Sequence, residues 1–155
     1  MAYNIIDIID KAINIAINRK NIYEGISKEK SNASSLKIIS KALVKETEKT
    51  IQYYISLKNE LSHQLLDEID FSIYDKMSFL INEFNKKKYL MEINNPQEFF
   101  MFSYSIERDL HSLFVDIQGR FVKDTDDMKK KTYEILSDLI TQKAEIILQI
   151  EDFLK

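Results

Sequence analysis

The chain lacks cysteine altogether among its 155 residues. This absence excludes disulfides, a thiolate nucleophile, and every zinc, iron–sulfur or rubredoxin-type iron site that is built from cysteine ligands. Histidine is also scarce, with two residues in the whole chain. The usual catalytic triads therefore have little material to draw on, and we expect no catalytic residues of that kind.

Glycine and proline, the residues that most often interrupt helices, number only 2 and 1. Hydrophobic residues make up 45% of the chain and charged residues 30%. This composition predicts long helices with few breaks. The length suffices for one substantial core, so we expect a single domain that spans residues 1–155.

Long apolar runs are missing as well. The N-terminal segment is apolar with a helical period, but it carries Asp7 and Asp10, which neither a signal peptide nor a membrane span would tolerate. We therefore expect a cytoplasmic protein with no membrane partner. The formal net charge of −3 argues against broad contact with a phosphate backbone, so no nucleic-acid partner is expected either.

Apolar residues recur every three or four positions, which predicts four long helices joined by two short turns and one long crossover. The expected helices cover residues 4–27, 35–65, 96–121 and 128–153, and the crossover at 67–95 contains a short helix at 72–84. Asn95 before Pro96 is a good helix cap, and Thr125 or Asp126 is expected to cap the last helix. The predicted fold is an all-α four-helix bundle with its long crossover between the second and third helices.

Each expected helix carries a polar residue inside its apolar face. In the second helix, for example, the face that includes Leu43 and Tyr54 is interrupted by two threonines. Since the turns are short, the interruptions should lie at similar heights along the bundle. The interrupting residues are Lys20, Thr47, Thr50, Glu107 and Lys143.

Several motifs accompany these interruptions: Ala16 and Ile17 with Tyr23 in the first helix, Glu46 in the second, and the Asn-Pro pair before the third. In this pattern the chain resembles, over nearly its whole length, the diiron domain of rubrerythrins in the ferritin-like superfamily. The resemblance implies six ligand positions, one Glu on each of two helices and a Glu-x-x-His on each of the others. In this chain those positions fall on Lys20, Thr47, Thr50, Glu107, Lys143 and Ile146.

Only Glu107 keeps a ligand type at those positions, and the two lysines repel a cation. The resemblance thus implies a degenerate diiron site with no cofactor, in a protein that acts as a metal-free binding or assembly module. The alternative is a rubrerythrin-type oxidoreductase that reduces peroxide or oxygen at a non-standard iron site, with Glu107, Glu46 and His111 as its fallback metal ligands. A third possibility is a small-molecule pocket in the vacated centre.

The charged residues inside the faces have two possible fates. Lys20 and Lys143 could pair with Glu107, because a lone buried charge is costly while a pair roughly breaks even. They could instead extend to solvent, leaving Glu107 to bond with hydroxyl groups. His63 is expected at the surface, since it lies too far along the second helix to reach the centre. The family habit of dimerising and the apolar segment 99–102 suggest a homodimer; the sequence identifies no other protein partner.

Overall fold

The computed structural model describes residues 3–29, 34–89 and 91–155. The described chain is almost entirely helical, which confirms the all-α prediction. Its elements are α1 (Ile5–Glu29), α2 (Ser34–Leu61), α3 (Phe71–Lys86), α4 (Pro96–Phe121), the 3₁₀ helix η1 (Thr125–Lys129) and α5 (Lys131–Leu154). Among the described residues, none of these helices combines the length and apolar character that crossing a lipid bilayer demands.

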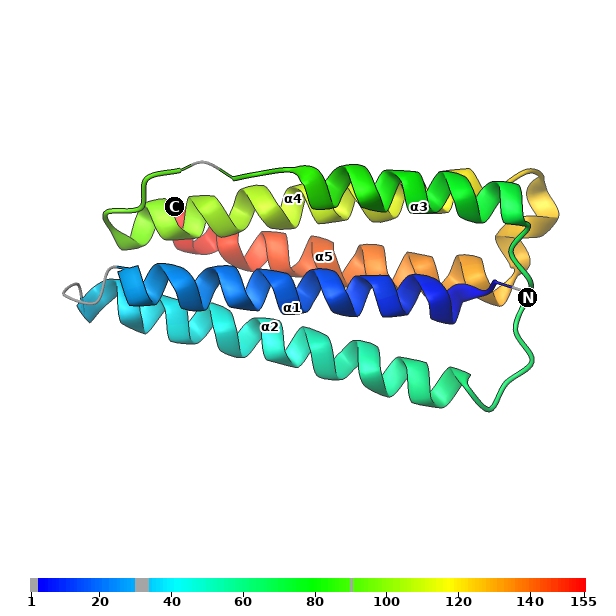
Figure 1. Ribbon diagram of the computed structural model, residues 1–155, viewed down its shortest axis with the longest axis horizontal. Coiled ribbons are helices and arrows are strands. Elements are labelled where there is room, and N and C mark those ends of the chain that lie inside the picture. Colours follow the sequence, from blue (N-terminus) through cyan, green and yellow to red (C-terminus); the bar gives the residue numbers. More distant parts are fainter. Residues whose placement is uncertain (1–2, 30–33, 90) are drawn as a thin grey trace.

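The four longest helices, α1, α2, α4 and α5, run along the long axis of the molecule (Figure 1). α1 packs against α2, and α4 packs against α5, as expected for neighbours joined by short connections. The chain then uses the long segment between α2 and α4 to cross over, and α3 within it lies along α4 (Figure 1). A backbone bridge between Tyr3 and Ile69 holds the start of the chain against this segment.

α2 ends at Leu61, four residues earlier than the 35–65 range predicted from periodicity. Leu65, expected on the buried face, is fully exposed. Leu61 is the last residue of α2 that contacts the core, and the polar residues 62–64 after it have no apolar surface to bury. The helix therefore stops where its burial stops.

Side-chain caps fix the starts of α4 and η1. Asn95 accepts a hydrogen bond from the Glu98 backbone N–H at 2.9 Å, as predicted, and Pro96 occupies the first turn of α4. The predicted cap at Thr125 or Asp126 is wrong. Asp124 caps η1 instead, because the chain makes a 3₁₀ turn before α5 begins and the cap must precede that turn.

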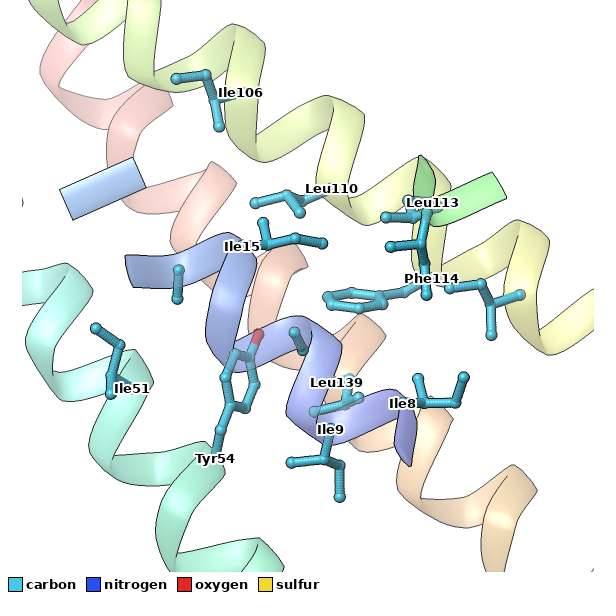
Figure 2. Close-up of a cluster of buried hydrophobic side chains, with 14 of the residues drawn as sticks. Ile8, Ile9, Ile15, Ile51, Tyr54, Ile106, Leu110, Leu113, Phe114 and Leu139 are labelled. Atoms are coloured by element: carbon cyan, nitrogen blue, oxygen red, sulfur yellow. The ribbon is translucent and has the colours of Figure 1, made fainter. Parts of the chain in front are cut away.

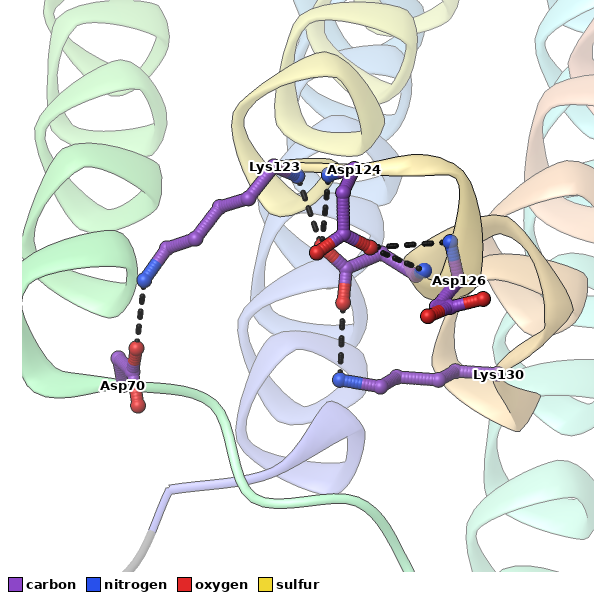
Figure 3. A network of polar contacts seen from close by, with 6 residues as sticks. Asp70, Lys123, Asp124, Asp126 and Lys130 are labelled. Atoms are coloured by element: carbon purple, nitrogen blue, oxygen red, sulfur yellow. Dashed lines mark hydrogen bonds and ion pairs between the residues drawn. The ribbon is translucent and has the colours of Figure 1, made fainter.

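A polar network surrounds this turn (Figure 3). Asp127 completes a capping box with Asp124 and accepts from the Lys123 backbone N–H at 2.8 Å. The side chain of Lys123 reaches Asp70, the residue before α3, at 2.7 Å. The turn after α4 is thereby tied to the start of α3.

The core is formed by aliphatic and aromatic side chains from all five α-helices. Figure 2 shows Ile9 of α1, Tyr54 of α2, Phe114 of α4 and Leu139 of α5 among them. Tyr54 is buried while its neighbour Tyr53 is only partly so, since adjacent helical residues cannot share one face.

Two residues expected to face inward from the last helix do not. Met128 is 50% exposed, because it belongs to η1 and not to the helical face of α5. Phe153 is 69% exposed; it lies beyond Ile150, the last buried residue of α5, and stacks on Phe100 of α4 with ring centroids 4.8 Å apart. Both corrections concern helix ends, where the neighbouring helices no longer cover the chain.

Candidate functional site

Three buried charged side chains from three helices meet inside the protein. Glu107 of α4 accepts a hydrogen bond from Nη1 of Arg19 on its Oε1 atom. Its other oxygen, Oε2, lies 3.1 Å from Nζ of Lys143 on α5. All three residues are at most 3% exposed. We call this set, Arg19, Glu107 and Lys143, the ion cluster.

The prediction that Lys20 lies in the buried face of α1 is wrong, because Arg19 takes that place. The buried face of α1 includes Ile15, Arg19 and Tyr23, four residues apart, whereas Lys20 is turned toward the surface. Lys20 pairs there with Glu48 of α2 at 3.1 Å. Helical steps of three and four residues allow either Arg19 or Lys20 on the buried face between Ala16 and Tyr23. The pattern of apolar residues alone therefore could not show which of the two is buried. The regular four-residue step from Ile15 to Tyr23 was the signal that could have pointed to Arg19.

The pairing of Lys143 with Glu107, one of the two fates considered, is confirmed, and its extension to solvent is wrong. The cluster is nevertheless unbalanced, because two cations share one carboxylate. Arg19 Nε, Glu107 Oε2 and Lys143 Nζ have no hydrogen-bond partner among the described residues. The 3.1 Å contact of Lys143 is therefore an electrostatic one that is poorly aligned for a hydrogen bond.

This arrangement shifts the ionisation of its members. Burial by itself would raise the pKa of Glu107, but the nearby positive charges of Arg19 and Lys143 outweigh it and lower that pKa. Burial lowers the pKa of Lys143 to about 8, and the like charge of Arg19 acts in the same direction. The carboxylate is thus held ionised, while Lys143 carries the least favourable charge of the three.

A hydroxyl pair lies beside the ion cluster. The hydroxyl of Tyr23 on α1 donates to Oγ of Ser103 on α4 at 2.9 Å. Burial is the main reason that the pKa of Tyr23 rises to about 12, so this phenol is neutral. Since Ser103 accepts this bond, its own hydroxyl hydrogen remains available to a further acceptor.

The two threonines of α2 are buried but do not join the ion cluster. Thr47 donates to the Leu43 carbonyl at 2.7 Å, and Thr50 donates to the Glu46 carbonyl at 3.2 Å. Each hydroxyl is thus satisfied within its own helix, a common arrangement for threonine in a helix interior. The possibility that threonine hydroxyls bond to Glu107 is therefore wrong for both.

A cavity of about 280 Å³ opens between α2 and α5 next to the ion cluster. Arg19, Tyr23, Ser103 and Glu107 line it, together with Thr47 and Glu46 of α2. Its remaining walls are mostly apolar and include Leu43, Phe100, Ile146, Ile150 and Phe153. Ile146, expected at a ligand position by resemblance, is thus part of an apolar wall.

The fallback metal ligands do not gather around one point. Glu46 lies at the cavity with Glu107, but His111 lines a separate groove between α4 and α5 with Tyr104 and Arg108. His63 is exposed in the turn after α2, as expected. Within residues 3–29, 34–89 and 91–155, no three His, Cys, Asp or Glu side chains are grouped so that they could hold a metal ion.

The donor set does not fit a diiron centre. Iron of this type needs several carboxylates and imidazoles, whereas the cavity has two carboxylates, Glu46 and Glu107, and Glu107 has a cation against each oxygen. Comparison of the chain with models of known protein families, with curated proteins and with solved structures finds no match.

Proposed function

We propose that this protein is a ferritin-like four-helix bundle of the rubrerythrin type, with the ion cluster at the level of the family's diiron centre, and that it works as a metal-free binding module. In this proposal α1, α2, α4 and α5 are the four bundle helices, and α3 belongs to the crossover. One observation carries it: Arg19 and Lys143, from two different helices, contact the two oxygens of Glu107.

This contact supports a metal-free protein for a simple electrostatic reason. A metal ion bound by Glu107 would have to displace Arg19 or Lys143 and then share a low-dielectric site with both of their charges. Other positions that the resemblance assigns to metal ligands hold Thr47, Thr50 and Ile146. Their hydroxyl and aliphatic side chains add no anionic ligand. The ion cluster supplies the positive charge that a metal would otherwise bring to Glu107.

The cavity beside the cluster supports binding as the activity. Its volume of about 280 Å³ is near the lower end of the range for small-molecule sites, and it combines apolar walls with a few buried polar groups. We propose a homodimer as the working assembly, with Phe153 near the end of α5, which is 69% exposed, as a contact residue.

The test is the metal content of the protein purified without chelators from iron-supplemented cells. We expect iron, manganese and zinc close to zero per chain by mass spectrometry, and a melting temperature that EDTA leaves unchanged. About two metal ions per chain would overturn the proposal and favour the rubrerythrin-type oxidoreductase. Analytical ultracentrifugation of the same sample tests the homodimer separately.

A further inference from the structure

The ion cluster has one positive charge more than its single carboxylate compensates. Arg19 Nε and Lys143 Nζ are buried donors that lack a hydrogen-bond partner among the described residues. Buried donors and charges normally have partners, because a buried group without a hydrogen bond or a counter-charge costs free energy. An anion is one kind of group that would compensate this charge.

Arg19 also lines the cavity between α2 and α5, so an anion there would face its guanidinium, while Arg19 Nε and Lys143 Nζ stay covered and contribute charge rather than contact. Ser103 lines the same cavity, and its hydroxyl can donate a second hydrogen bond because Tyr23 already donates to its oxygen. Glu107 lines the cavity too, but its charge is offset by Arg19 and Lys143. An arginine and a hydroxyl that line one cavity suit a carboxylate, which accepts several hydrogen bonds.

The rest of the cavity fixes the character of the ligand. Leu43, Ile146 and Ile150 supply aliphatic wall, and the stacked rings of Phe100 and Phe153 supply a flat apolar face. Each methylene buried against such walls favours binding, whereas a second charge placed there would be desolvated without a partner. The walls therefore select against dicarboxylates and sugars.

We infer that this cavity binds a small monocarboxylate with an apolar body, its carboxylate on Arg19 and Ser103 and its body between Leu43, Ile146 and Phe100. The inference rests on the proposed metal-free function, since a metal at Glu107 would change the charge balance. Lys143 does not line the cavity; it acts at a distance by neutralising Glu107. Glu46 also lines the cavity; it is half-buried and its negative charge acts on both Arg19 and Lys143, so an anionic ligand has to overcome its repulsion.

The experiment is isothermal titration calorimetry of the full chain near neutral pH with octanoate, octan-1-ol and octylamine, which share a chain and differ in charge. We expect octanoate to bind about tenfold or more tightly than octan-1-ol, and octylamine not to bind. Equal affinity for octanoate and octan-1-ol would overturn the inference, since burial of the chain alone would then explain binding. Absence of octanoate binding would overturn it as well.

Variants locate the site and the charge. Lys143→Met should weaken octanoate binding about tenfold while leaving octan-1-ol unchanged, and Lys20→Met, which removes a surface lysine outside the cavity, should have no effect. Gln149→Trp at the cavity should block octanoate, whereas Gln52→Trp, an exposed glutamine of α2 away from it, should not. If Lys20→Met weakened binding as much as Lys143→Met, the buried charge would not be the cause. Metal analysis of the same sample distinguishes this inference from the proposed metal-free function. Protein that contains no metal and does not bind octanoate would contradict only the inference about the cavity.

Discussion

Nζ of Lys143 lies 3.1 Å from Oε2 of Glu107, and both residues are buried. The pair joins α5 to α4, and Arg19 on the other oxygen adds α1. Because the three charges are out of water, their effect on folding depends on their balance and not on the number of contacts. Loss of the charge on Glu107 should therefore affect stability differently from loss of the charge on Lys143.

Glu107→Gln should destabilise the protein strongly. The change leaves Arg19 and Lys143 buried without a counter-charge, and breaking a buried pair in this way costs about 3–5 kcal/mol. Thermal and urea unfolding followed by circular dichroism would measure the loss. Glu60→Gln, at an exposed position of α2, is the matched control. A loss no larger than that of the control would show that the carboxylate does not stabilise the cluster.

Lys143→Met should behave differently although it removes a partner of the same carboxylate. It leaves Arg19 and Glu107 as a balanced pair and replaces a buried ammonium by an apolar side chain of similar length. We expect the free energy of unfolding near neutral pH to stay within about 1 kcal/mol of the parent protein or to rise. A loss as large as that of Glu107→Gln, measured under the same conditions, would contradict the charge imbalance.

The stability should rise with pH in the mildly alkaline range. The pKa of Lys143 is about 8 in the folded protein and 10.5 as an unperturbed group, so the unfolded chain holds more protons between these values. The free energy of unfolding then increases with pH there, by roughly 1–2 kcal/mol between about pH 8 and about pH 9.5. Urea titrations across this interval would show it, and Lys143→Met should abolish the rise.

At still higher pH the trend should reverse. Burial raises the pKa of Tyr23 to about 12, and it also raises the pKa of Tyr54 above its usual value. Since these phenols ionise earlier in the unfolded chain, stability falls once the pH passes the ordinary tyrosine pKa of about 10. A continued rise of stability beyond that pH in the same titrations would contradict the burial of both rings.

The turn after α4 should depend on one aspartate more than on its neighbour. Asp124 accepts from the backbone N–H groups of Asp126 at 2.9 Å and of Asp127 at 3.3 Å, whereas the Asp126 side chain is exposed and has no role in the cap. Asp124→Ala should cost about 0.5–2 kcal/mol, a typical value for a lost cap. Asp126→Ala should cost less, and equal losses in urea unfolding would count against the capping role.

Much of the local structure could be read from the chain. The spacing of apolar residues predicted the helices, with α3 observed at Phe71–Lys86 against an expected 72–84. Asn95 and Pro96 marked the start of α4 correctly, and His63 lies at the surface. These features depend on residues close together in sequence, so local propensity and periodicity suffice to find them.

The rotation of α1 could not be read in the same way. Arg19 and Lys20 are adjacent basic residues, and a small rotation of α1 about its axis decides which one is buried. That rotation is set by how the isoleucines of α1 fit against α2 and α4, which is a property of the packed core. The role of Thr47 and Thr50 was open for a related reason, since a hydroxyl can bond within its helix or across to another.

The sequence by itself determined that the chain is helical, where most helices begin, and that Glu107 and Lys143 belong to buried faces, because these properties follow from the order of apolar and polar residues. Only the tertiary structure decided that Arg19 is the second cation, that Lys143 meets Glu107, and that a cavity remains beside them. Partners of a buried charge and the space left around it depend on how helices distant in sequence fit together, and no local pattern encodes that fit.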